Sequence, residues 1–272
     1  MKQKEENKMA LTQHSITPQK IDRRENLSYK EFITEYATPR KPVILSGNIK
    51  SWSAMDKWTP AYLQEKYGSA AVTIHHCTPG DRDIYETTLG EYIDYYLSQT
   101  DENAEEDPWY CDWSFVKNCP ELLKYYENPV YFKENWTRFI PKLRTNDLRW
   151  VFIGPKNTWT PLHCDFANTS AWNALLAGEK KWVFYSPEQT PYMYKGKVDA
   201  FNPNLKEFPE FSKSIPMYGT QRAGDIVYTP SGWWHQVRNE THTICVSENF
   251  IDKTNYKYSL VPYIKQIIKA SI

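Results

Sequence analysis

The side chains best suited to chemistry in this 272-residue chain are His163, Asp165 and His235. His163 and Asp165 are two positions apart, and residues two apart on a β-strand point to the same face, so both can reach one ion while Cys164 points away. A single histidine from another strand would complete three ligands. Two imidazoles and one carboxylate on one face of an octahedral ion leave the opposite positions open, as in non-heme Fe(II) oxygenases. The pattern therefore predicts a metal site able to bind a cosubstrate and dioxygen.

The segments around these residues predict short β-strands. After Asp165 a polar turn leads into residues 170–185, which read as two strands around Gly178, the second rich in aromatic and β-branched side chains. Residues 224–229 read as a further strand that stops at Pro230, shortly before His235. A run of short strands separated by turns predicts a mainly β fold, a barrel or double-sheet jelly roll, with the metal ligands at its mouth.

Three motifs carry a resemblance to a known family. They are TSAWNAL at residues 169–175, G-x-K-x-W at residues 178–182 and PSGWWH at residues 230–235. Together they resemble the Jumonji-C (JmjC) oxygenases, which depend on 2-oxoglutarate and Fe(II), and most of all the lysyl-hydroxylase branch of that family. The resemblance covers residues 150–250, with a looser match at residues 39–68. It implies a cupin-like double-stranded β-helix core, preceded by helix and strand elements and followed by a C-terminal helix.

The resemblance also assigns roles to individual residues. It makes His163, Asp165 and His235 the iron ligands, and it places Lys180 where the family has the cation that pairs with the distal carboxylate of 2-oxoglutarate. The residue pattern agrees, because a lysine between a glycine turn and an apolar run is oddly placed in an ordinary strand, and an ammonium suits a carboxylate. We expect the neighbouring Lys181 to face solvent. The alternative is that both lysines are surface residues.

Further contacts to the cosubstrate are implied at five positions, with ordinary strand packing as the alternative at each. Thr160 does not share the strand parity of His163, but Pro161 between them can bend the chain and remove that objection. Asn173 is a polar residue in an apolar strand and should be hydrogen-bonded if buried. The full set of implied cosubstrate contacts beyond Lys180 is Thr160, Asn173, Ser247, Tyr110 and Asn249.

The implied cofactors are Fe(II), 2-oxoglutarate as cosubstrate and O2, and the implied reaction couples decarboxylation of 2-oxoglutarate to succinate with hydroxylation of a substrate. The leading hypothesis is a protein lysyl hydroxylase acting on a protein or peptide. Fold and ligands do not determine the substrate, so an N-methyl demethylase and a tRNA hydroxylase remain alternatives. A non-catalytic metal-binding cupin is the alternative of another class. Lys180 separates that class from the others, because only a keto acid cosubstrate needs a cation.

Composition is that of a globular protein without an overall charge bias. Lys plus Arg equals Asp plus Glu at 33 each, so no overall basic field favours nucleic acid, and a local basic patch is the remaining route to such a partner. The five cysteines form no C-x-x-C pair, which indicates free thiols in a reducing compartment. The polar first 25 residues do not resemble a signal peptide, and no stretch reaches transmembrane length. We expect a cytoplasmic protein without a membrane partner, or a nuclear one if the source is eukaryotic.

Four parts are expected along the chain. Residues 1–25 read as a flexible tail, 26–145 as the N-terminal helix and strand part of the catalytic domain, 146–250 as the double-stranded β-helix core and 251–272 as a C-terminal helical segment. Helices are expected after Ser28, at residues 59–68 and at residues 89–99, and the loop at residues 190–219 is a candidate frame for the substrate entrance. Apolar residues of the last segment line one helical face that packs on the barrel or forms a homodimer; they are Leu260, Ile264, Ile267 and Ile268.

Overall fold

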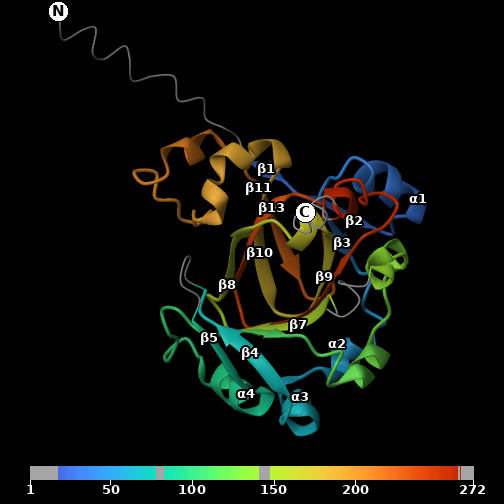
Figure 1. Cartoon of the computed structure of the whole chain (residues 1–272). Helices are drawn as coiled ribbons and strands as arrows, with labels where there is room; N and C mark the ends of the chain where they lie inside the picture. Colours follow the sequence, from blue (N-terminus) through green and yellow to red (C-terminus); the bar gives the residue numbers. More distant parts are fainter. Residues whose placement is uncertain (1–17, 78–82, 141–147, 263, 265–272) are drawn as a thin grey trace, which may run out of the picture.

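Two β-sheets form the framework of the protein. The computed structural model describes residues 18–77, 83–140, 148–262 and 264 (Figure 1). The smaller sheet consists, in spatial order, of β1 (Gln19–Lys20), β11 (Met217–Arg222), β10 (Glu179–Tyr185), β13 (Trp234–Asn239) and β8 (Trp159–His163). The larger sheet consists of β2 (Asp22–Glu25), β3 (Val43–Ser46), β12 (Ile226–Thr229), β9 (Ser170–Ala177), β14 (Thr243–Phe250), β7 (Arg149–Gly154), β6 (Tyr110–Trp113), β4 (Ala71–His75) and β5 (Ile84–Thr88).

The chain passes back and forth between the two sheets, as a jelly roll requires. The strands predicted on either side of Gly178 are β9 and β10, and they belong to different sheets. Gly178 adopts φ +86°, and a Cβ there would lie 2.1 Å from the carbonyl oxygen of His242, so only glycine fits this crossover. The predicted mainly β fold with a jelly-roll core is therefore confirmed, with β4, β5 and β6 extending the larger sheet at one edge.

Short helices lie outside the sheets, and the local sequence explains where they begin. They are α1 (Tyr29–Phe32), the π-helical turn η3 (Ile33–Ala37), α2 (Ser53–Lys57), α3 (Pro60–Tyr67) and α4 (Leu89–Ser98). Ser28 forms the expected capping box with Glu31, and Thr88 forms another at the start of α4. The 3-10 turns are η4 (Pro120–Tyr125), η5 (Val130–Phe132), η6 (Trp136–Phe139), η7 (Phe166–Asn168), η8 (Pro187–Tyr192), η9 (Tyr194–Gly196) and η10 (Pro209–Lys213).

The structure describes part of each end of the chain. The flexible tail expected over residues 1–25 does not extend to residue 25, because β1 and β2 pair in parallel with β11 and β3 and the Ile21 side chain between them is buried. The first 17 residues lie outside the described part. Of the expected C-terminal helix, residues 260–262 are helical, and Ile267 and Ile268 lie outside the described residues. No helix in the described ranges has the length and apolar character needed to span a bilayer.

A cluster of buried aromatic rings connects the helical segments to the larger sheet. Phe132 on η5 lies at its centre, with its ring centroid 5.4 Å from those of Phe32 on α1 and Phe250 on β14. It also stacks on Trp172 of β9 and Tyr228 of β12, at 6.2 and 6.0 Å. Aromatic pairs contribute beyond their buried area, so this cluster holds the N-terminal elements against the sheet that carries half of the site.

Residues 187–213 form a separate layer that packs on β8 and β10 (Figure 1, orange). Met193, Val198 and Phe211 from this layer pack on Leu162 of β8 and Tyr185 of β10 in a small apolar core of their own. None of the described residues that line the cavity containing His163, Asp165, His235 and Lys180 comes from residues 190–219. This layer therefore packs on the face of β8 and β10 that points away from His163 and Lys180. The expectation that the loop frames the substrate entrance has no support among the cavity-lining residues.

Replacing Phe132 with alanine tests the aromatic cluster. We expect Phe132→Ala to lower the free energy of unfolding by about 3–5 kcal/mol, because it removes a fully buried ring and leaves a cavity. The matched control is Phe139→Ala, whose ring is 76% exposed and whose loss should have little effect. Urea denaturation followed by circular dichroism measures both, and equal effects of the two changes would contradict the central role of Phe132.

Candidate metal centre and cosubstrate cavity

The three predicted metal ligands converge at one point. One ligand atom from each of His163, Asp165 and His235 lies within 4.8 Å of the other two. β8 and β13 are paired with His163 directly opposite His235, and their ring centroids are 4.2 Å apart. One detail differs from the expectation: β8 ends at His163, and Asp165 follows the strand in extended conformation as the residue before η7. The extended backbone still turns Asp165 toward the same ion position as His163.

Backbone carbonyl groups orient both imidazoles. Nδ1 of His163 lies 2.7 Å from the carbonyl oxygen of Pro161, and Nδ1 of His235 lies 3.2 Å from that of Trp233. Since a carbonyl only accepts, each Nδ1 is the donor, which leaves the Nε2 lone pair of each ring free for a metal. Burial and the nearby His163 also lower the pKa of His235 well below its usual value, which keeps this ring neutral.

Asp165 is a buried carboxyl group with an unused acceptor. Its Oδ2 is buried and has no hydrogen-bond partner among the described residues. Burial raises the pKa of Asp165, while His163 and a hydrogen bond from Asn249 oppose that rise. A buried carboxylate oxygen without a partner is costly, and a bound cation removes that cost. The unsatisfied oxygen and the two Nε2 atoms are therefore a donor set that fits a divalent metal with open positions, as Fe(II) requires.

Lys180 lies in the same cavity as a buried ammonium group. Its residue is 2% exposed, and its Nζ donates to Asn239 Oδ1 at 2.9 Å and to Tyr110 Oη at 3.2 Å. No carboxylate within the described ranges forms an ion pair with it. Buried charges in proteins are ordinarily paired, so an ammonium held only by neutral groups is suited to an incoming anion. Lys181, as expected, faces the other side of β10, where it lines a different groove.

A β-bulge explains how Thr160 reaches the cavity. His235 pairs with His163, but Val237 pairs with Thr160, so three positions along β8 correspond to two along β13. The extra residue in β8 changes its parity near Pro161 and turns Thr160 to the face of His163. The Thr160 hydroxyl is buried and has no partner among the described residues, which leaves it available to a ligand.

The remaining predicted cosubstrate contacts also face this cavity, although they have protein partners. Asn173 Nδ2 lies 3.4 Å from Cys245 Sγ, Ser247 Oγ donates to the carbonyl of Trp172 at 2.8 Å, and Asn249 Nδ2 donates to Thr169 Oγ1 at 2.9 Å. These bonds fix the side chains, and they are also compatible with a purely structural role.

The cavity has a volume of about 510 Å³ and brings together all nine side chains singled out in the sequence. Several of its lining residues were not found by sequence reasoning; they are His75, Asp112, Trp150, Phe152, Phe166, Ala171, Trp182, Thr229 and Val237. The available signal for Asp112 was its spacing of two from Tyr110 on one strand, and the signal for Asn239, the Lys180 partner, was its parity with His235.

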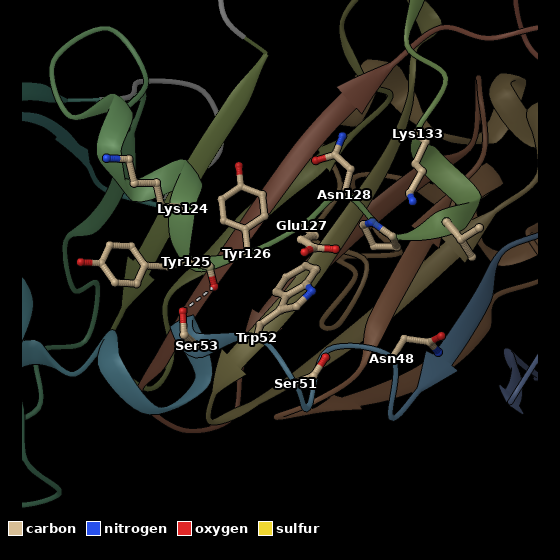
Figure 2. Close-up of a pocket in the computed structure, with 12 residues that line it drawn as sticks. Asn48, Ser51, Trp52, Ser53, Lys124, Tyr125, Tyr126, Glu127, Asn128 and Lys133 are labelled. Carbon is tan, nitrogen blue, oxygen red and sulfur yellow. Dashed lines mark hydrogen bonds between the residues drawn. The ribbon is translucent and has the colours of Figure 1, made fainter.

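A second hollow of about 530 Å³ lies elsewhere, between the loop before α2 and the segment around η4 and η5. Figure 2 shows its lining residues, including Trp52, Lys124 and Tyr126, and the hydrogen bond from Ser53 to the backbone of Tyr125. Its lining contains no histidine or cysteine and a single carboxylate, Glu127. It therefore lacks a donor set for a transition metal, and the chemistry of the described residues is concentrated in the first cavity.

Comparison with known proteins supports the same conclusion. Residues 29–256 match the cupin-like domain family. The lysine-specific demethylase JMJ21 of Arabidopsis thaliana is 36% identical over 252 residues, which are 88% of this chain and 26% of that protein. The 2-oxoglutarate and iron-dependent oxygenase JMJD4 of Gallus gallus is 30% identical, with 86% of this chain and 60% of that protein covered.

A third relative is the bifunctional arginine demethylase and lysyl-hydroxylase psr-1 of Caenorhabditis elegans, at 32% identity over 85% of this chain and 60% of that protein. This chain thus spans between 26% and 60% of the length of these three curated relatives. The family match covers most of the chain and includes every strand except β1 and β2 and every residue of the metal and ammonium sites. The chain therefore belongs to the cupin-like domain family, and the resemblance to its JmjC oxygenases that the motifs suggested is confirmed.

Proposed function

We propose that this chain is an Fe(II)- and 2-oxoglutarate-dependent oxygenase that hydroxylates a lysyl side chain of a protein substrate. The observation that carries the proposal is the convergence of His163, Asp165 and His235 at one end of a cavity that also buries the Lys180 ammonium. A metal-binding cupin without oxygen chemistry binds no keto acid and does not require a buried ammonium group. The names of the relatives, a 2-oxoglutarate and iron-dependent oxygenase and a lysyl-hydroxylase among them, support the same reaction class.

In this proposal each residue has a defined task. His163, Asp165 and His235 would hold the metal, and the backbone acceptors of Pro161 and Trp233 keep both Nε2 atoms directed at the site. Fe(II) held there would supply the chemistry that couples loss of carbon dioxide from the keto acid to oxidation of a substrate C–H bond.

At the other end of the cavity, Lys180 binds the distal carboxylate of the keto acid, with the Thr160 and Tyr110 hydroxyl groups beside it. Asn173, Ser247 and Asn249 line the cavity wall next to the metal. The flanking rings of Trp182 and Phe184 lie 6.0 and 5.6 Å from the His235 ring and stack beside it.

Removal of N-methyl groups is the second candidate, because two of the three relatives described above are named demethylases of lysine or arginine. Both reactions use the same centre, and they differ only in the carbon that is oxidised. Hydroxylation of a tRNA base needs a basic surface for phosphates, and the neutral net charge of the chain does not favour it.

Succinate release tests the oxygenase class directly. We expect the wild-type protein, given Fe(II), 2-oxoglutarate and air, to release succinate, and Asp165→Ala to release none because the metal is lost. Under anaerobic conditions Fe(II) at about a hundred times its Kd should stabilise the wild type by about 2.7 kcal/mol and leave Asp165→Ala unchanged. The control is Asp101→Ala, whose carboxylate is 85% exposed and paired with Lys156. Equal succinate from Asp165→Ala and wild type would exclude the proposed metal site.

Lys180→Ala tests the anion-binding role. We expect it to weaken binding of 2-oxoglutarate by about 1.5–3 kcal/mol, or roughly 10- to 150-fold in Kd, because one charged hydrogen bond is lost. Fe(II)-induced stabilisation should persist. Lys181→Ala is the matched control, since Lys181 lies on the opposite face of β10, and its 2-oxoglutarate affinity should equal that of the wild type. Calorimetric titration measures both variants, and an unchanged Lys180→Ala affinity would remove the assignment.

The mass of the product separates hydroxylation from demethylation. We expect incubation with lysine-containing peptide pools to add one oxygen atom to a lysyl residue. Loss of a methylene from methylated lysine or arginine peptides, with no gain of oxygen on unmodified ones, would instead establish the demethylase reaction. Fragment spectra locate the changed residue, and Asp165→Ala serves as the inactive control.

A further inference from the structure

Asp112 is an acidic side chain that lines the cavity and has no role in the proposed reaction. It lies on β6 two residues after Tyr110, so both side chains face the cavity. Its side chain is 33% exposed, and its Oδ2 lies 3.2 Å from His75 Nε2. Its Oδ1 is buried and has no hydrogen-bond partner among the described residues. A carboxylate can accept about four hydrogen bonds, so most of this capacity is unused.

Aromatic rings surround this carboxylate on the cavity wall. Phe152 of β7 is the cross-strand neighbour of Asp112 and faces the same cavity. Its ring stacks with that of Tyr110 at 5.9 Å and with that of Trp150 at 6.4 Å, both within 24° of parallel. Ring faces next to a carboxylate favour a side chain with an apolar stem and a cationic head.

The negative charge continues outward along the same sheet face. Thr73 of β4 pairs with Asp112 on one side and with Glu86 of β5 on the other. Directly opposite residues on antiparallel strands point to one face, and Thr73 Oγ1 donates to Glu86 at 2.7 Å. Glu86 therefore lies further out on the wall that carries Asp112, where β4 and β5 form the edge of the larger sheet (Figure 1).

The balance of charge in the loaded cavity favours a cation at this wall. A divalent metal, Asp165, Lys180 and a dianionic keto acid cancel one another, so Asp112 carries the charge that remains. His75 faces the His76 carbonyl with Nδ1 and Asp112 with Nε2, so it donates at both nitrogens and offsets this charge, and the Glu86 carboxylate then leaves the wall negative. An anionic side chain would be repelled, an apolar one would leave the Asp112 acceptors unsatisfied, and a neutral donor would lack the charge attraction.

We propose that Asp112 is the specificity-determining residue that receives the positively charged side chain of the substrate, with Phe152 and Trp150 along its methylene chain. The role as a substrate contact rests on the proposed function, whereas the cation site itself does not. His75 is the positioning residue, because its Nε2 holds one carboxylate oxygen while its Nδ1 lies 3.0 Å from the carbonyl oxygen of His76.

Small amines test the site without turnover. The protein is loaded with Zn(II) and 2-oxoglutarate, and binding of n-butylammonium, which has the length and charge of a lysyl side chain, is compared with that of n-butanol by saturation-transfer NMR. We expect the wild type to prefer the amine by about tenfold or more, as for one charged hydrogen bond. Asp112→Asn should remove that preference, and Asp101→Asn, an acid outside the cavity, should retain it.

A second variant keeps the test decisive should Asp112→Asn fail to fold. Asp112→Glu moves the carboxylate by one methylene and should shift the preference from n-butylammonium to the shorter n-propylammonium. An amine preference that survives Asp112→Asn, a wild type without any preference, or an unchanged size ranking in Asp112→Glu would overturn the proposal.

The two proposals fail in different ways. Amine binding by a wild type that releases no succinate would refute the oxygenase function and leave the cation site in place. Succinate release by a wild type that does not distinguish the amine from the alcohol would refute the cation site and leave the oxygenase function in place.

Discussion

The position of β13 between β8 and β10 is the constraint on which the rest of the site depends. Pairing with β8 places His235 opposite His163, and pairing with β10 places Asn239 opposite Lys180. Because side chains alternate between the two faces of a strand, a slip of one residue would turn His235 out of the cavity and separate the Lys180 ammonium from its acceptor. One strand register therefore sets both the metal end and the ammonium end, and the apolar layer behind β8 and β10 keeps that register in place.

The cavity combines groups that are individually unfavourable in a folded protein. Asp165 Oδ2 and Thr160 Oγ1 are buried without partners among the described residues, and the Lys180 ammonium is bound there only by neutral oxygens. Each such group costs on the order of 1–3 kcal/mol. The surrounding structure, above all the aromatic cluster at Phe132 and the long ladders of β14, must offset that cost. Ligands that satisfy these groups should therefore bind tightly and stabilise the fold at the same time.

Local sequence patterns predict some of these features well. The other features depend on contacts between segments that are distant in the sequence, which such patterns do not predict. The capping box at Ser28, the convergence of the three predicted metal ligands and the inward orientation of Lys180 follow from short motifs, and the structure contains all of them. The position of Thr160 depends on a bulge that strand parity alone argues against. The contact between Asp112 and His75 joins β6 to β4, and no local pattern predicts it. Adjacent histidines also give no indication of which one faces the cavity.

The charges along the cavity also impose an order on ligand binding. With a divalent metal alone, Asp165 cancels only part of the metal charge and Lys180 adds to it, so the inner cavity is positive and repels a cationic substrate. A dianionic keto acid bound between the metal and Lys180 neutralises that end, and the acidic wall of Asp112 and Glu86 is then the charge that the substrate meets. A chain with the same three metal ligands but without these two opposite charges would select neither ligand. In the proposed function, the opposite charges of Lys180 and Asp112 in one cavity thus distinguish an oxygenase for cationic side chains from a cupin that only stores a metal.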